Sequence, residues 1–478
     1  MKAFKRSVIG IAVLALAGGA AALFALQQLG VAPRVLARYV ERRAEKHNNG
    51  VVAAAGLAAH AALLADRGTG TAALPFALTI GAQPVSPAST ATGRETVVAS
   101  VAELAAAVEH AGPGDVITML PGRYRLGGGI GLARSGLPGQ AIVLRARDPG
   151  SVFIEVDAVQ GFVVSGSDWL VENLTIKGIC SDHASCDHAF HVVGAGARFT
   201  ARNNTISDFN AHFKINGEGG RFPDQGRIES NTLDNSAARA TDSTVAAIDL
   251  VGANGWVIRK NLIRDIVKGG GDQVSYGGYA KGAGSHNLFE QNVVLCESAL
   301  QGLPGARVGL SLGGGGSGKE FCRDKRCITE QEDSTLRANL VAGCSDAGIY
   351  LNSAARSTIA DNTLLDTAGI DVRFAASTAR LDGNLVDGAI RSRNDGVIYL
   401  GENRSTSTAA LFLGWHPVRS LFADPALLAL DWAQTPPRRD TPAGERSSDL
   451  CGVPRPAQPA LGAFEDWKAC RRQDGARR

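Results

Sequence analysis

Short apolar segments, interrupted by polar and glycine positions, follow one another along most of the chain after about residue 95. A small unit, Asn followed by two residues that are apolar or Thr, recurs among them. Its asparagines are Asn173, Asn204, Asn231, Asn261, Asn292, Asn339, Asn362 and Asn384. Successive units lie 31, 27, 30, 31, 47, 23 and 22 residues apart, with short strands and glycine-rich corners between them. Such intervals are typical of a right-handed parallel β-helix, in which each coil returns the chain one sheet spacing further along the axis.

The recurring asparagines are predicted to be structural. At one corner of each coil, an asparagine can hydrogen-bond the backbone of the next coil and so form an internal ladder. The longest interval holds a coil plus the insertion GGGGSGKEFCRDKRCITEQED at residues 313–333. Leucine-rich repeats are the competing solenoid, but the chain lacks an LxxLxL frame. We therefore predict an all-β fold, a right-handed parallel β-helix behind an N-terminal membrane helix.

The N-terminus predicts that membrane helix. Basic residues at positions 2, 5 and 6 precede an uncharged run from Ser7 to Val31, which is long enough to span a bilayer. We expect a signal anchor over residues 1–31, and a cleavable signal peptide stays open because AGGAAA offers cleavage sites. Basic residues on both sides of the run leave its orientation open.

Composition shifts divide the rest of the chain. Residues 32–94 are rich in alanine and include PVSPASTATG, which predicts a juxtamembrane helix and a linker. We place the β-helix, with an N-terminal cap, at residues 95–404. Residues 405–478 form either a C-terminal cap or a mobile tail.

The eight cysteines behind an export-like segment favour disulfides in an oxidising compartment. Cys180 with Cys186 and Cys322 with Cys327 can each close a local loop, and Cys451 with Cys470 can tie the tail. Cys296 and Cys344 fall at matching corners of adjacent coils, so a bridge is expected there, with two buried free thiols as the alternative. We therefore place the main domain outside the cytoplasm, in the periplasm, or secreted if the N-terminal segment is cleaved.

Alternation along the strand before each ladder unit predicts which side chains point outward. On one sheet the outward residues are His191, Lys214, Asn216, Asp249, Tyr279, Lys281, Tyr350, Asn352, Asp371 and Arg373. A row of charged, amide and aromatic groups is typical of a saccharide-binding groove, and an ordinary solvated sheet face is the alternative. The 49 basic and 46 acidic residues are too balanced to indicate a nucleic-acid partner.

Three sequence stretches resemble a known family. ETVVASVAELAAAVEHAGPGDVITMLPGRYR, WLVENLTIKGI and YAKGAGSHNLFEQNVVLCES are similar to the first coils and the lysine strand of the polysaccharide lyases of the chondroitinase B and alginate lyase group. The resemblance covers roughly residues 95–315. It implies a β-helix that cleaves acidic polysaccharides by β-elimination, with Lys281 as the base and an arginine one coil later.

The chain departs from the family at that arginine. Ser311 or Leu312 stands at the expected place, and Arg307 lies four or five residues earlier as a shifted equivalent. Either Arg307 replaces the arginine, or the activity is altered or absent. A lysine base must lose its proton, so its pKa must fall from about 10.4 through desolvation or nearby positive charge.

Other residues complete the predicted site. Lys214 with Arg307 or Arg373 can supply the positive charge beside the base. Proton donors to the leaving oxygen can come from the side chains of His191, His212, Tyr279 and Tyr350.

A metal is not required by this reading. Two cysteines and three histidines crowd into CSDHASCDHAFH, but their spacing and compartment favour a disulfide over zinc. Calcium remains possible at the acidic residues of the insertion, Asp324, Glu330, Glu332 and Asp333, although they lack the order of a calcium loop.

The expected function is thus a polysaccharide lyase that acts on an acidic polysaccharide, held at the membrane by its N-terminal helix. Two alternatives stay open: a C5-epimerase, which shares the proton abstraction, and a glycan-binding envelope protein without catalysis.

Overall fold

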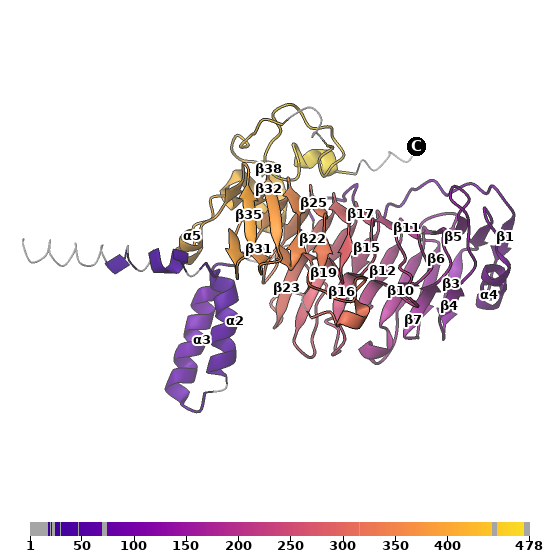
Figure 1. Ribbon diagram of the computed structural model, residues 1–478, viewed down its shortest axis with the longest axis horizontal. Helices are drawn as coiled ribbons and strands as arrows, with labels where there is room; N and C mark the ends of the chain where they lie inside the picture. Colours follow the sequence, from indigo (N-terminus) through magenta and orange to yellow (C-terminus); the bar gives the residue numbers. More distant parts are fainter. Residues whose placement is uncertain are drawn as a thin grey trace, which may run out of the picture.

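The computed structural model describes residues 18–19, 21, 24–28, 30–45, 47–68, 74–314, 316–441 and 447–472. Three long parallel sheets run side by side along an elongated solenoid (Figure 1). The chain passes from one sheet to the next and returns to the first one coil later, so the fold is a parallel β-helix, as predicted. Its right-handedness stays a prediction.

The twelve-stranded sheet begins each coil. Its strands are β1 (Glu95–Val98), β2 (Val116–Met119), β5 (Ile142–Ala146), β8 (Trp169–Glu172), β11 (Thr200–Arg202), β14 (Arg227–Glu229), β17 (Val257–Arg259), β21 (Leu288–Glu290), β25 (Thr335–Arg337), β29 (Ser357–Ala360), β32 (Thr378–Asp382) and β35 (Val397–Leu400).

The eleven-stranded sheet comes next in each coil. It consists of β3 (Gly122–Leu126), β6 (Val152–Val156), β9 (Thr175–Gly178), β12 (Thr205–Ser207), β15 (Thr232–Asp234), β18 (Leu262–Arg264), β22 (Val293–Leu295), β26 (Leu340–Ala342), β30 (Thr363–Leu365), β33 (Leu385–Val386) and β36 (Arg404–Ser405).

The ten-stranded sheet completes each coil and carries most of the predicted site residues. It consists of β4 (Ile130–Leu132), β7 (Gln160–Val164), β10 (His188–Val193), β13 (Ala211–Asn216), β16 (Val245–Val251), β19 (Val274–Lys281), β23 (Ala306–Leu312), β27 (Ile349–Asn352), β31 (Gly369–Arg373) and β34 (Ala389–Arg393). A short sheet of β20 (Gly284–Ser285), β24 (Gln331–Glu332) and β28 (Ala354–Ala355) lies at one corner.

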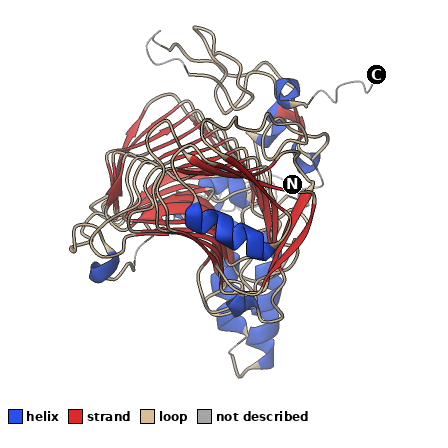
Figure 2. Cartoon of the chain, turned by 90° about the vertical axis from the view of Figure 1, so that its right-hand side faces the viewer, coloured by secondary structure: helices blue, strands red, loops and turns tan. Residues whose placement is uncertain are grey.

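Apolar side chains from all three sheets fill the interior. Phe162, Phe190 and Phe213 stack on successive coils, with ring centroids 5.2 and 5.3 Å apart. Helix α4 (Val101–His110) covers the N-terminal end of the solenoid and buries Leu104 and Val108 there (Figure 2). The core therefore continues from coil to coil, as in other solenoids.

The asparagine ladder is present. Each ladder side-chain oxygen accepts hydrogen bonds from the backbone N–H of the preceding rung, for example Asn231 Oδ1 from Asn204 at 2.9 Å. The prediction was wrong at its first member, because Leu174 rather than Asn173 donates to Asn204. Asn403 is a further rung that the sequence pattern missed.

All four predicted disulfides are formed, Cys180–Cys186, Cys296–Cys344, Cys322–Cys327 and Cys451–Cys470. The bridge between Cys296 and Cys344 joins adjacent coils, as their matching corners predicted. Four disulfides support a location outside the cytoplasm.

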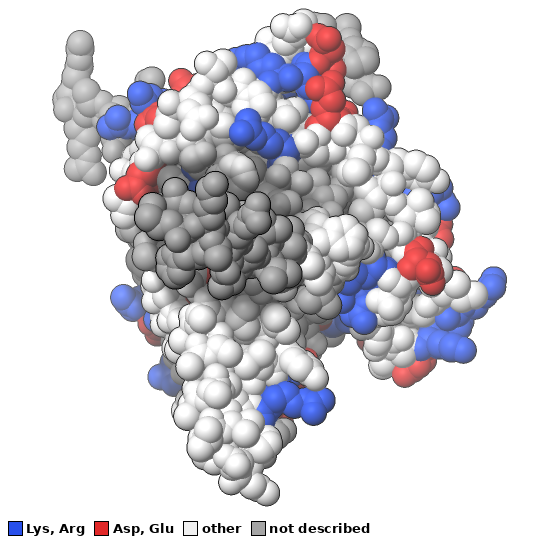
Figure 3. Space-filling view, turned by 90° about the vertical axis from the view of Figure 1, so that its left-hand side faces the viewer, with Lys and Arg blue, Asp and Glu red and all other residues white. Residues whose placement is uncertain are grey.

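The N-terminal region contains two helices that project from the side of the solenoid, α2 (Pro33–Ala44) and α3 (Gly50–Leu64) (Figure 1). Few charged side chains mark the lower part of this hairpin in Figure 3, and α3 contains no Asp, Glu, Lys or Arg. Arg34 attaches the hairpin to the body through Asp366 at 2.9 Å, and it also pairs with Asp66, just after α3, at 2.7 Å. The predicted anchor at residues 1–31 lies largely outside the described residues, and none of the helices within them is long and apolar enough to cross a membrane.

The predicted linker packs against the solenoid. We call residues 74–94 the strap. It forms hydrogen bonds with residues of several coils. For example, Gly81 N donates to Lys260 O at 2.8 Å, and Ser89 N donates to Glu172 Oε1 at 2.7 Å.

The C-terminal residues form a cap. It contains α5 (Thr408–Phe412), β37 (Phe422–Asp424), β38 (Ala429–Trp432) and the 3-10 turns η3 (Arg419–Leu421), η4 (Pro425–Leu427) and η6 (Trp467–Cys470). A second apolar core, with Phe464 and Trp467, joins this cap to the outer face of the eleven-stranded sheet. Two further 3-10 turns lie in the solenoid, η1 (His183–Ser185) and η2 (Lys319–Phe321).

Candidate functional site

A cavity of about 490 Å³ lies on the outer face of the ten-stranded sheet. Strands β13, β16 and β19 form its floor, because their register places Lys214 beside Asp249, and Val251 beside Lys281. The predicted residues that line it are His191, Lys214, Asn216, Asp249 and Lys281. Parallel pairing thus brings together side chains that are up to 90 residues apart in the chain.

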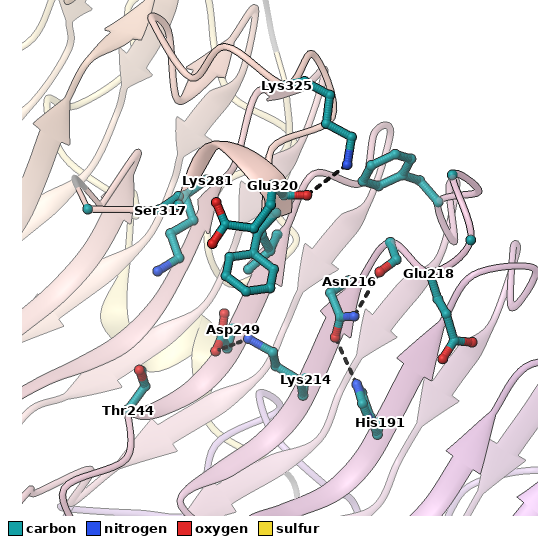
Figure 4. A pocket seen from close by; sticks show the side chains of 18 of the residues that line it. His191, Lys214, Asn216, Glu218, Thr244, Asp249, Lys281, Ser317, Glu320 and Lys325 are labelled. Atoms are coloured by element: carbon teal, nitrogen blue, oxygen red, sulfur yellow. Dashed lines mark hydrogen bonds and ion pairs between the residues drawn. The ribbon is translucent and has the colours of Figure 1, made fainter.

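The insertion forms the roof of this cavity. We call residues 313–314 and 316–330 the flap. From the end of β23 it turns back over the floor, and Glu320, Phe321 and Lys325 of the flap line the cavity (Figure 4). Where the flap leaves the sheet, a Cβ on Gly314 would lie 3.0 Å from Lys281 Cδ. The glycine run therefore leaves room for the lysine side chain.

Lys214 and Lys281 differ in their electrostatic partners. Lys214 Nζ forms an ion pair with Asp249 Oδ2 at 2.7 Å. Lys281 Nζ lies 4.8 Å from the centroid of the Tyr279 ring and makes no ion pair with any described residue. Burial alone would raise the pKa of Asp249, but Lys214 and Lys281 outweigh it and lower that pKa. Asp249 is therefore ionised, and most of its charge is engaged by Lys214.

Tyr279 lies beneath Lys281 and is 2 % exposed. Burial, together with the neighbouring Asp249 carboxylate, raises the pKa of Tyr279 well above its ordinary value. Its hydroxyl and Asp249 Oδ1 are both buried without a well-formed hydrogen bond among the described residues. Tyr279 also lines a second cavity of about 160 Å³. Lys281 and Thr244 line both this cavity and the larger one.

Two histidines form one wall of the larger cavity. His191 Nε2 donates to Asn216 Oδ1 at 2.8 Å, since a carbonyl oxygen can only accept. Burial lowers the pKa of His191, and Lys214 adds to this effect although the hydrogen bond to Asn216 opposes it. Burial also lowers the pKa of His188 to about 4. Both imidazoles are therefore neutral at neutral pH.

Arg307 and His212 lie away from the cavity. Arg307 is 2 % exposed, and its Nε lies 3.4 Å from Glu297 Oε1. In the register of β23 with β19, Arg307 lies beside Ser275. Ser275 precedes Lys281 by six residues, so Arg307 lies about 20 Å from Lys281 along the strand direction. His212 is fully buried, with Nε2 3.0 Å from Asp234 O, and burial lowers its pKa to about 4. We carry neither residue into the proposed site.

Four further predicted residues lie on later coils of the same sheet. Asp371 is paired with Arg391 and Arg393. Arg373 Nε donates to Asn394 Oδ1 at 3.0 Å, and Asn352 Nδ2 donates to the Tyr350 hydroxyl at 3.1 Å. Each of these four side chains thus contacts another polar side chain of the later coils, and none of the four lines the cavity.

Sequence reasoning missed several cavity residues, namely His188, Glu218, Phe222, Thr244, Glu320, Phe321 and Lys325. Most of them lie on turns or on the flap, where strand alternation gives no signal. The unusual length of the interval around the insertion was the one available clue to the flap.

Metal ligands do not gather within the part of the chain that the structure describes: no group of three His, Cys, Asp or Glu side chains is arranged to hold an ion. The four acidic residues of the insertion have separate partners. Glu330 accepts from Gly282 N and Ser317, Glu332 and Asp333 pair with Arg356, and Asp324 accepts from the backbone of its own turn.

Comparisons with known proteins agree with this architecture. Residues 98–255 match the family model described as Chondroitinase B. The crystal structure of pectate lyase Pel9A is similar, with a TM-score of 0.51 and 15 % identity over 76 % of this chain and 90 % of that chain. A PL6 family polysaccharide lyase from Pseudopedobacter saltans gives a TM-score of 0.36 and 12 % identity over 69 % of this chain and 97 % of that chain. No curated protein sequence matches the chain.

These findings confirm the resemblance to the parallel β-helix polysaccharide lyases. The sequence match includes His191, Lys214, Asn216 and Asp249 and ends 26 residues before Lys281. The likeness to the pectate lyase supports the fold alone.

Proposed function

We propose that the protein binds an acidic, uronate-containing polysaccharide outside the cytoplasm and cleaves it by β-elimination, with Lys281 as the base. One observation carries the proposal. The Lys281 amine has no ion pair among the described residues and ends in a roofed cavity beside the Lys214–Asp249 pair. An amine placed in this way is available to a ligand rather than to a carboxylate of the protein.

The reaction needs a base and a way to stabilise negative charge. Lys281, in its neutral form, would take the proton from C5 of a uronate. The electron pair of that C–H bond forms a C4–C5 double bond, and the bond from C4 to the leaving oxygen breaks. The C5 proton is acidic enough only when the neighbouring carboxylate is neutralised, so a cation must lie beside it.

Lys214 is the cation that we assign to this role. Its ammonium group has two donors left after the ion pair with Asp249. Tyr279 keeps its proton at neutral pH because its pKa is raised, so it can return a proton to the leaving oxygen from the side of the smaller cavity. His191 and Asn216 would hold sugar hydroxyl groups through their free donor and acceptor positions.

The test is an elimination assay on the purified protein with alginate, chondroitin, dermatan, heparan and pectate. We expect the ultraviolet absorbance of an unsaturated uronate to rise with one of these substrates, and Lys281→Ala to lower the rate at least about 100-fold. Lys468→Ala, which removes an exposed lysine on the C-terminal cap, should leave the rate unchanged.

The same reactions, run in deuterated water, separate the alternatives. Deuterium at C5 without unsaturated product would identify a C5-epimerase and contradict cleavage. Binding of a polysaccharide with neither product nor exchange would identify a glycan-binding protein, for which the absent family arginine would be the physical reason.

A further inference from the structure

We propose that the flap forms a second saccharide subsite, in which Phe321 stacks on a sugar ring and Lys325 binds a uronate carboxylate. This subsite would hold the unit next to the one that reacts at Lys281. The inference rests on the proposed function for the class of ligand, and on the flap itself for the location.

The flap is fixed in place rather than loose. Arg323 donates to both carboxylate oxygens of Asp224, at 2.7 and 2.8 Å, and to Gly252 O at 3.0 Å. Its guanidinium group also stacks over the Phe222 ring, 4.7 Å from the centroid. The Cys322–Cys327 disulfide closes the loop around Arg323. A roof held in this way is preorganised, so a ligand does not have to order it on binding.

Phe321 is the main evidence for a ligand. Phe321 is 64 % exposed although it lines a cavity, where several charged side chains and Phe222 line the other walls. A large exposed aromatic group at such a place is typical of a binding surface, because the flat apolar face of a sugar ring can cover it. Within the described residues, no aromatic ring or cation packs against Phe321.

Lys325 supplies the charge that an acidic sugar requires. It comes from the same roof and lines the same cavity as Phe321. Its Nζ donates to Glu320 O at 2.7 Å, which fixes the ammonium group and leaves two donors for a carboxylate (Figure 4). An aromatic face and a held ammonium together match one uronate unit.

The experiment measures binding of oligosaccharides of alginate, chondroitin, dermatan, heparan and pectate, from two to six units long. Calorimetry is done in the Lys281→Ala background, where nothing should be cleaved. We expect Phe321→Ala to raise Kd about tenfold for the longer oligosaccharides and less than about twofold for the dimer. Lys325→Ala should raise Kd about threefold and weaken its dependence on salt. In the enzyme with Lys281 intact, both changes should raise KM and leave kcat within about twofold.

Two matched controls come from the same insertion. Ile328 is 61 % exposed but does not line the cavity, so Ile328→Ala should leave Kd unchanged. Arg326 is the basic neighbour of Lys325 and lies outside the cavity lining, so Arg326→Ala should do the same. Thermal unfolding of each variant checks that the flap variants remain folded.

The outcomes separate this inference from the proposed function. If elimination occurs but Phe321→Ala binds like Ile328→Ala at every length, the flap subsite is wrong and the base assignment stands. If oligosaccharides bind with the expected length dependence but no substrate is cleaved, the elimination is wrong and the subsite stands. Absence of any binding overturns both.

Discussion

Two stretches of the ten-stranded sheet present similar charges to the outside, and they differ in what those charges contact. On β13, β16 and β19, Lys214 pairs with Asp249 and Lys281 is left without an ion pair among the described residues. On β31 and β34, Asp371 accepts from both Arg391 and Arg393. The flap covers only the first stretch. The comparison teaches that an outward row of charges can form a site where counterions are too few and a flap covers one side of the sheet.

The later coils show the structural use of the same residue types. Asp371 is 3 % exposed, so its charge would be costly without its two arginines. In the site stretch, burying the Asp249 carboxylate beside the Tyr279 hydroxyl costs stability, because Lys214 is the single ion-pair partner of Asp249 among the described residues. Such a loss of stability is common at functional sites.

The largest effect that tests the comparison is on stability. Asp371→Asn should lower the free energy of unfolding by about 4 kcal/mol, because it leaves two arginines beside a neutral group, and should leave turnover unchanged. Asp249→Asn should cost less, about 2 kcal/mol, because it leaves one partly exposed lysine instead of two arginines, and should lower turnover strongly. Denaturant unfolding and the elimination assay measure both. Equal stability losses would remove the distinction between the two stretches.

A smaller effect concerns the pH dependence of stability, which should come partly from a histidine that lies outside the cavity. His212 has a pKa of about 4 in the fold against 6.5 when exposed. Below pH 6.5, His212 therefore binds a proton in the unfolded chain but stays neutral in the folded chain. Stability should fall as the pH drops toward about 4. The fall attributable to His212 is at most about 3 kcal/mol.

The variant His212→Gln checks this assignment, because it keeps a donor near Asp234 O and does not titrate. Unfolding measured across this pH range should be less steep for the variant. An unchanged slope would mean that His212 reaches water in the folded state. His110→Gln, at an exposed position of α4, is the matched control.

The smallest expected effect comes from placing a carboxylate beside Lys281, as Asp371 lies beside Arg391 and Arg393 on the later coils. Val251 lies beside Lys281 in register, and both line the cavity. Val251→Asp should stabilise the charged form of the lysine and lower turnover at neutral pH about tenfold, with activity recovering at higher pH. Val251→Asn, of similar size and uncharged, should lack this pH shift. The same pH profile for both variants would contradict a base role for Lys281.

Much of the solenoid could be predicted because its signals are local. The asparagine spacing marked the coils, and matching corners predicted the Cys296–Cys344 bridge. Alternation correctly placed Lys214, Asp249 and Lys281 on one face. The ladder prediction failed by one residue at Asn173, where the first rung is a leucine backbone instead of an asparagine.

The rest depends on contacts between distant residues. The flap is held by Arg323 and Asp224, which are 99 residues apart, and no local pattern indicates that pair. His212 was a candidate because it lies on β13 beside the site strands, but it is fully buried and its ring bonds Asp234 O of the next coil. Arg307 was a reasonable candidate by position, but it is buried beside Glu297, which also pairs with Arg67, 230 residues earlier in the chain.

The strap gives the solenoid a property that stacked coils alone lack. Thr79 N donates to Cys470 O near the end of the described chain, and Ser89 N donates to Glu172 near the start of the solenoid. One extended segment thus ties the last part of the chain to the first coils. Peeling of coils from the N-terminal end of the solenoid would have to break these contacts as well, so unfolding from that end should be slow and resistance to proteases high. The same closure can be completed only after the C-terminal cap has been made, which places docking of the strap late in folding.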